Sequence, residues 1–218
     1  EVHGTLPVRV VILLEGEEES GSESLVPFLR EHKETLQADT CIVCDTSMWD
    51  KDTPAITSRL RGLVYIEATL HGPSHDLHSG GYGGAVVNPA NALTEILGQL
   101  HDTEGKVQID GFYDDVDEVS QEQIDRWNSL GDADASLLES SGAKATYGEK
   151  GFSTLERLWS RPTCDINGLR AGYLGEGAKT VIGANATAKI SCRLVAHQKP
   201  EMIQKALFKF LEERTPKG

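Results

Sequence analysis

The sequence predicts a chain of mixed fold: part of a parallel α/β domain, then a small α+β domain in which helices cover one face of an antiparallel sheet. Two observations lead to this prediction. Val8–Leu14 is a continuous apolar run, which is typical of a strand buried on both faces of a parallel sheet. Two later stretches, 58–71 and 186–195, alternate apolar and polar residues, which indicates half-buried antiparallel strands. A polar, proline-containing connection at 46–57 separates the two patterns.

The first domain, residues 1–55, has the pattern of a strand–helix–strand unit. Val10–Leu14 predicts the first strand, residues 22–32 predict a helix with a serine-rich start, and Cys41–Cys44 predicts the second strand. Strands connected in this way are parallel and end on the same side of the sheet. We expect the two cysteines of the second strand to be core residues rather than a redox or zinc pair.

Carboxylates follow both predicted strands. Glu15, Glu17, Glu18 and Glu19 come after the first strand, and Asp45 comes after the second. Like charges this close disfavour ionisation unless a bound cation lies between them. Oxygen-rich ligand sets suit divalent ions, including zinc, and a spare carboxylate can deprotonate metal-bound water. The sequence therefore predicts a metal site here, with a solvated acidic turn that caps the next helix as the alternative.

The second domain, residues 56–216, is expected to be a sandwich of one antiparallel sheet and two helices. Asn88-Pro89 predicts the start of one amphipathic helix and Pro200 predicts the start of the other. A polar insertion at about 101–165 lies between the strands, and its Ser120-x-x-Gln123 pattern predicts a capping box. The residues expected to face the core from the two strands are Leu60, Val64, Ile66, Ala68, Leu70, Ala186, Ala188, Ile190, Cys192 and Leu194.

The first strand of this domain leads into a glycine-rich loop, 72–84, whose backbone can approach a ligand closely. We expect His71 and His75 to be solvated. His78 lies in the sequence Asp-Leu-His-Ser-Gly-Gly and is the histidine of interest in this loop.

Bulk properties exclude some classes of partner. The net charge of −13 and the pI near 4.9 make a nucleic-acid partner unexpected. No apolar run is long enough to span a bilayer, so we expect no membrane partner. The absence of a signal-peptide pattern favours a cytoplasmic protein, but a targeting signal upstream of residue 1 would lie outside this sequence.

Five short motifs occur in one order along the chain: EGEEESGS, Asp45 after a strand, DLHSGGYGG, GEGAKTVI and ISCRLV. Together they resemble the M20 family of metallopeptidases, and most closely its carnosinase-like dipeptidases. This resemblance implies a two-metal catalytic domain interrupted by a lid domain of ferredoxin-like fold, through which the enzyme forms a homodimer. It implies two zinc (or manganese) ions in each active site.

The resemblance also implies roles for individual residues of the acidic cluster. Glu18 would be the general base, Glu19 a ligand to one metal and Asp45 a ligand to the other. Choosing Glu18 rather than Glu17 depends on aligning E-E-S-G-S with the family's E-E-x-G-S.

Three residues of the second domain acquire roles in the same way. His78 would stabilise the oxyanion in the partner subunit's site, and Thr180 and Arg193 would contact substrate, with Arg193 suited to a terminal carboxylate. Without the resemblance, Thr180 would be a turn hydroxyl and Arg193 a charge on the surface of a strand.

One departure limits what this chain can do alone. The family's H-x-D histidine, bridging aspartate and late histidine have no counterpart here, and His3 lacks the H-x-D context. We therefore expect a fragment without a tight metal site and without turnover. The expected parent enzyme hydrolyses dipeptides or short peptides. The alternatives are an N-acyl-amino-acid deacylase or desuccinylase of the same superfamily, and a non-catalytic dimerisation module.

Overall fold

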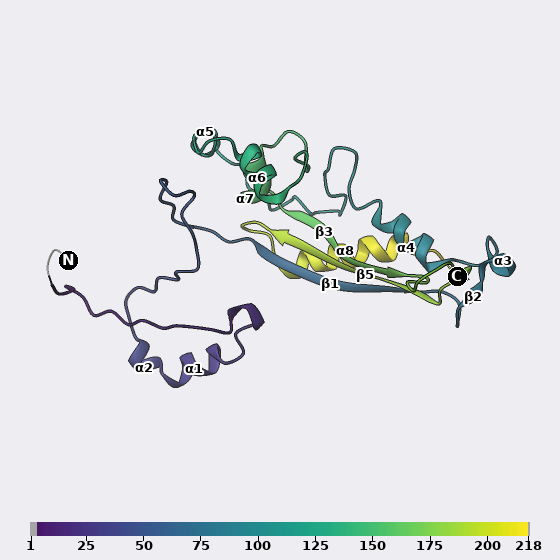
Figure 1. Cartoon of the computed structure of the whole chain (residues 1–218), viewed down its shortest axis with the longest axis horizontal. Coiled ribbons are helices and arrows are strands. Elements are labelled where there is room, and N and C mark those ends of the chain that lie inside the picture. Colours follow the sequence, from purple (N-terminus) through teal and green to yellow (C-terminus); the bar gives the residue numbers. More distant parts are fainter. Residues whose placement is uncertain (1–3, 218) are drawn as a thin grey trace. The chain divides into compact units, whose positions relative to one another are not determined.

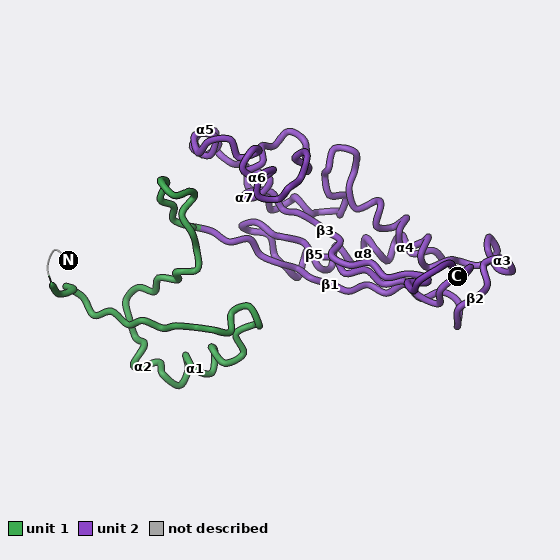
Figure 2. The backbone as a smooth tube through the Cα atoms, in the orientation of Figure 1, with its two compact units in different colours: residues 1–58 green, residues 59–218 purple. Residues whose placement is uncertain are grey.

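The computed structural model describes residues 4–217 and has two compact units, Glu1–Ser58 (unit 1) and Arg59–Gly218 (unit 2) (Figure 2). His3 lies outside the described residues. The boundary at residues 55/56 stays a sequence-based prediction, and the two units divide just after it.

Unit 1 contains a short 3-10 helix, η1 (Glu18–Ser20), and two helices, α1 (Leu25–Glu31) and α2 (Lys33–Leu36). The two strands predicted at Val10–Leu14 and Cys41–Cys44 do not form in this structure: both segments are irregular and exposed. A buried parallel strand needs paired neighbours and apolar layers on both faces, and residues 4–58 supply neither. For the same reason the two cysteines expected in the core are exposed.

Unit 2 is built on a three-stranded antiparallel sheet of β1 (Gly62–His71), β3 (Thr163–Ala171) and β5 (Asn185–Leu194), in the order β1-β5-β3 (Figure 1). The predicted alternation is confirmed for β5, where all five expected residues are buried. It also holds along β1, except that Leu60 is exposed because the strand begins only at Gly62.

Two helices, α4 (Pro89–Leu97) and α8 (Pro200–Arg214), pack against the sheet. Both begin with proline in the first turn, as predicted. The Asn88 side chain caps α4 by accepting a hydrogen bond from the Ala90 N–H at 3.0 Å. The apolar face of each helix is buried against the sheet through Leu93, Ile96, Leu97, Ile203, Leu207, Phe210 and Leu211.

The segment expected to be a polar insertion contributes more to unit 2 than its polarity indicates. Val107, Ile109 and Phe112 are buried in the main core, and the segment ends in β3, which the sequence analysis did not predict. A β-bulge between Ile166 and Gly168 interrupts the alternation of β3, so inward and outward positions exchange within the strand. Cys164 of β3 lies opposite Cys192 of β5, and both thiols are buried.

The remainder of the insertion forms three helices, α5 (Gln121–Asn128), α6 (Ala133–Ser141) and α7 (Thr154–Trp159). The capping box predicted at α5 is present only in part: Ser120 Oγ accepts a hydrogen bond from the Gln123 N–H, which caps the helix. A complete capping box occurs at α7 between Ser153 and Glu156. Among the described residues, no helix combines the length and the apolar character needed to cross a membrane.

Two ion pairs lie at the base of the insertion, and we call this region the neck. Lys150 Nζ lies 2.7 Å from Glu104 Oε1 on the surface. Arg161 forms two hydrogen bonds of 2.8 Å with the carboxylate of Glu149, and these two side chains keep only 16% and 12% of their exposure. The Arg161 guanidinium also lies over the ring of Phe152.

A second, two-stranded sheet lies where β1 ends. It pairs β2 (Leu77–His78) with β4 (Val181–Ile182), and the short helix α3 (Ser79–Tyr82) follows β2 directly (Figure 1). The glycine-rich loop thus folds against the segment that leads into β5.

Candidate functional site

The acidic cluster of unit 1 lies at a tight turn that separates its carboxylates into two groups. Glu17 is engaged within the chain, because its carboxylate accepts hydrogen bonds from the Ser24 N–H and Oγ–H, both at 3.1 Å. Glu18 and Glu19 form the start of η1 and are exposed to solvent. Glu17 is thus the carboxylate of this turn that hydrogen-bonds within the chain, and the roles expected for Glu18 and Glu19 stay predictions.

The structure does not gather a metal site. Asp45 is exposed in the same unit as Glu18 and Glu19, but no group of three or more His, Cys, Asp or Glu side chains within residues 4–217 is arranged to hold a metal ion. Structural and catalytic zinc sites require at least three protein ligands. The described residues therefore do not fit a complete metal centre, and the ligand roles of Glu19 and Asp45 stay predictions.

The structure brings His78 and Thr180 together, although 102 positions separate them in the chain. Pairing of β2 with β4 sets His78 opposite Val181, and the Ser79 N–H donates to the Thr180 carbonyl at 3.0 Å. As a result, Thr180 Oγ1 lies 3.3 Å from His78 Nε2. Both residues are exposed, so the pair is open to a ligand.

The loop that carries His78 is attached to the rest of unit 2 by Asp76, a residue that the sequence analysis did not single out. Asp76 Oδ1 accepts a hydrogen bond from the Ala184 N–H at 2.9 Å, just before β5. The only signal for this role was its place next to a strand in the glycine-rich loop. His71 and His75 are exposed, as predicted.

Arg193 lies at the other end of the sheet. It precedes the last residue of β5 and pairs with Leu63 near the start of β1, whereas the His78–Thr180 pair lies where β1 ends and β5 begins. The eight residue steps from Asn185 to Arg193 correspond to about 26 Å of extended strand. The three predicted substrate-binding residues of unit 2 therefore form two separate places, not one.

The end of the sheet that carries Arg193 is locally basic. Arg61 lies on the same face, two residues before Leu63, and its side chain is partly buried. Burial lowers the pKa of Arg61, the charge of Arg193 lowers it further, and Asp165 on β3 opposes both effects. An arginine keeps its charge under such a perturbation, so this place carries positive charge in a strongly acidic chain.

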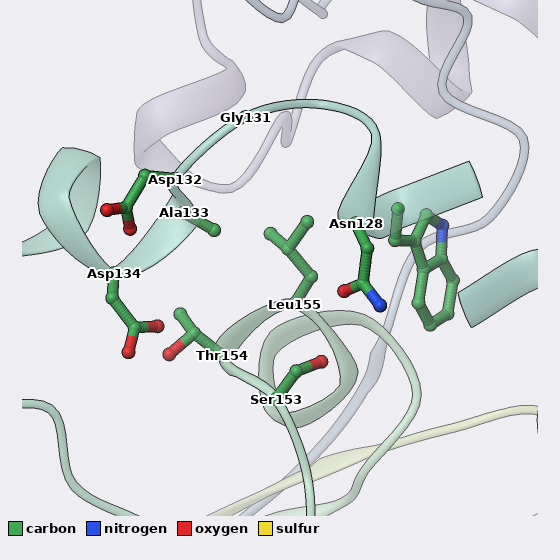
Figure 3. Close-up of a pocket in the computed structure, with 9 residues that line it drawn as sticks. Asn128, Gly131, Asp132, Ala133, Asp134, Ser153, Thr154 and Leu155 are labelled. Atoms are coloured by element: carbon green, nitrogen blue, oxygen red, sulfur yellow. The ribbon is translucent and has the colours of Figure 1, made fainter. Parts of the chain in front are cut away.

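A pocket of about 140 Å³ lies elsewhere, between the helices of the insertion (Figure 3). Its lining includes Asp132 and Ser153, but both side chains are already engaged as helix caps, accepting from the N–H groups of Ala135 and Glu156. We assign no function to this pocket, because its polar groups stabilise the ends of α6 and α7.

The fold of unit 2, together with the pairing of β2 in the glycine-rich loop with β4, defines a class of domain. Residues 59–218 match the family described as the peptidase dimerisation domain of the M20 peptidases, and the chain belongs to this family. The resemblance to M20 metallopeptidases, seen first in five short motifs, is confirmed.

Relatives of this chain are named metallodipeptidases or dipeptidases. It is 33% identical over 201 residues to the Cys-Gly metallodipeptidase dug1 of Schizosaccharomyces pombe, covering 91% of this chain and 42% of the relative. It is 29% identical over 210 residues to the human Beta-Ala-His dipeptidase, covering 95% of this chain and 41% of the relative. The chain thus spans less than half the length of these relatives.

Solved structures agree with this assignment. The M20 family metallo-carboxypeptidase Sso-CP2 from Sulfolobus solfataricus matches with a TM-score of 0.77 and 34% identity, covering 94% of this chain and 46% of that one. Human carnosine dipeptidase 1 matches with a TM-score of 0.76 and 29% identity, covering 92% and 43%. These matches confirm the predicted mixed α/β fold class, with the antiparallel sheet of unit 2.

Proposed function

We propose that this chain is the dimerisation domain and adjoining catalytic segment of a metal-dependent dipeptidase. The observation that carries the proposal is the His78–Thr180 pair, which the fold presents to solvent on a domain of the M20 family. The relatives, which are named metallodipeptidase and dipeptidase, support dipeptides or short peptides as the substrate class. We further propose a homodimer, two zinc (or manganese) ions in each active site and a cytoplasmic location.

The residues of this chain take different parts in the proposed hydrolysis. Glu19 and Asp45 would supply part of the ligand set of the metal ions, whose contribution would be activation of water and polarisation of the peptide carbonyl. Glu18 is exposed, and its proposed role is that of the general base. His78 donates a hydrogen bond to the oxyanion that forms on the substrate, which is the kind of interaction that lowers an activation barrier.

The geometry of unit 2 supports a catalytic site shared between two subunits. An extended dipeptide is about 7 Å long, whereas the Arg193 end and the His78–Thr180 end of β5 are about 26 Å apart. One dipeptide therefore does not contact both places within one subunit. We propose that in the dimer His78 and Thr180 act in the partner subunit's active site, whereas Arg193 binds a substrate carboxylate in the other active site.

Two other functions are compatible with the same chain. An N-acyl-amino-acid deacylase would use the same hydrolytic groups, and a non-catalytic dimerisation module would need none of them. The dipeptidase names of the relatives favour the first proposal.

The test is a substrate panel with the protein extended to the length of its relatives. We expect cleavage of Cys-Gly and related dipeptides, loss of activity with a chelator and recovery with zinc or manganese. Rapid hydrolysis of N-acyl-amino acids without dipeptide cleavage would reverse the order of the two enzyme functions. No hydrolysis of either class would favour the non-catalytic module.

Sharing of the site is tested by mixing two inactive variants, His78→Ala and Glu18→Ala. In a heterodimer, one site retains both Glu18 and a His78 from the other chain, so we expect part of the activity to return. A mixture that stays inactive after subunit exchange has been verified would show that His78 does not act across the interface.

A further inference from the structure

Both ring nitrogens of His78 have hydrogen-bonding partners, and one of these fixes the position of the ring proton. The Gly80 N–H donates to His78 Nδ1 at 2.9 Å, and Thr180 Oγ1 lies 3.3 Å from Nε2. A backbone N–H is always a donor, so Nδ1 must be the acceptor and carries no proton. The neutral ring then has its proton on Nε2, directed toward Thr180.

Gly80 leaves the space that the His78 ring occupies, and this effect does not depend on the backbone conformation of the glycine. Gly80 does not have a positive φ. A Cβ added there would lie 2.7 Å from His78 Cε1 and 2.9 Å from Nδ1, closer than real contacts allow. The imidazole would have to turn away, and its bond to the Gly80 N–H would be lost.

The next residue provides a natural control. Gly81 also belongs to α3 and also lacks a positive φ, but a Cβ added to it meets nothing within 4 Å. The two adjacent glycines therefore have similar backbone settings and differ in their distance from the His78 ring.

We propose that Gly80 is a positioning residue for His78: its amide selects the tautomer with the proton on Nε2, and its missing side chain leaves the space that the ring occupies. In the free site the Thr180 hydroxyl accepts a hydrogen bond from the Nε2–H of His78. A substrate oxygen that replaces this hydroxyl meets a donor already in place. This catalytic consequence rests on the proposed function, whereas the tautomer is a property of this chain alone.

The structural part is tested by NMR on this chain labelled with ¹⁵N, at a pH where the His78 ring is neutral. We expect an unprotonated Nδ1, a protonated Nε2 and a scalar coupling through the hydrogen bond between the Gly80 nitrogen and His78 Nδ1. Gly81→Ala should retain the coupling, and Gly80→Ala should lose it while the rest of the spectrum stays that of a folded protein. A protonated Nδ1 in the unsubstituted chain would overturn the proposal.

The catalytic part is tested in the full-length enzyme. We expect Gly80→Ala to lower kcat by about 10- to 100-fold with little change in KM, since misaligning a donor costs less than the roughly 10²- to 10³-fold loss on removing one. Gly81→Ala should stay within about twofold of the parent. Because Gly80 acts through His78, adding Gly80→Ala to His78→Ala should cause no further loss.

The possible failures are distinguishable. Equal kcat values for Gly80→Ala and Gly81→Ala, or a further loss when Gly80→Ala is added to His78→Ala, would refute the positioning role. Full activity of His78→Ala would instead refute the proposed role of His78, and the NMR result for the tautomer would stand unaffected.

Discussion

The neck of the insertion allows a quantitative comparison between two ion pairs that use neighbouring residues. Glu149 pairs with Arg161 in a largely buried setting, whereas Lys150 pairs with Glu104 where the side chains retain 64% and 58% exposure. Removing one partner of a buried pair leaves an uncompensated charge and typically costs about 3–5 kcal/mol, whereas an exposed pair contributes about 0–1 kcal/mol. The residual exposure of the Arg161 pair admits some water, so we expect Glu149→Ala to cost about 2–4 kcal/mol.

Urea unfolding followed by circular dichroism measures this difference. With a slope of about 2 kcal/mol per molar urea, the midpoint of Glu149→Ala should fall by about 1–2 M and that of Glu104→Ala by less than about 0.5 M. Arg161→Met added to Glu149→Ala should recover part of the loss, because it removes the unpaired charge. A Glu149→Ala midpoint as close to the parent value as that of Glu104→Ala would refute the reasoning.

Three further predictions concern unit 2. Gln198 is buried and its side chain bridges the Phe112 carbonyl and the Val195 N–H, so Gln198→Met should lower the free energy of unfolding by about 2–4 kcal/mol. The control Gln204→Met, on the exposed face of α8, should change it by less than about 0.5 kcal/mol. Equal unfolding midpoints of the two variants in urea would contradict this prediction. The hydrogen bond to Cys192 and burial raise the pKa of Cys164. Thiol labelling should therefore modify the two exposed cysteines of unit 1 first and reach Cys164 and Cys192 only when the protein unfolds. Rapid labelling of all four thiols in the folded protein would contradict this prediction. Burial raises the pKa of Tyr113 above its ordinary value of 10.0, so the folded state binds the phenolic proton more tightly than the unfolded state. The free energy of unfolding should therefore fall as the pH rises above 10. A Tyr113→Phe protein whose free energy of unfolding declines equally steeply would show that another group is responsible.

The sheet and helices of unit 2 could be predicted because their signals are local. Alternation in Ala186–Leu194 needs only that one face of the strand be covered, and Asn88-Pro89 starts a helix through its own side chain and ring. β3 escaped prediction because the bulge after Ile166 shifts its inward positions by one residue, which removes the period of two on which the prediction depends.

The candidate site could likewise be predicted only in part from the sequence. His78 and Thr180 could be named from motifs, but their contact depends on the pairing of β2 with β4, which two-residue strands do not reveal in sequence. The contact between Gly80 and the imidazole was invisible for the same reason. In unit 1, the apolar run Val8–Leu14 predicts a strand only if partners pair with it, and burial on both faces is a property of the surrounding fold.

The clamped neck makes the insertion a place where chain length can change at little energetic cost. The Lys150 N–H donates a hydrogen bond to the Glu104 carbonyl at 2.8 Å and the two side chains form an ion pair, so both ends of the segment 105–149 are held together and its length can change without moving either end. The connection that leads back from α6 ends near Tyr147, which is 86% exposed. Each doubling of a flexible loop costs only about 0.6 kcal/mol. This connection is therefore a suitable position for a fluorescent label or a fused peptide, and one where homologous chains could gain or lose residues while retaining the same sheet.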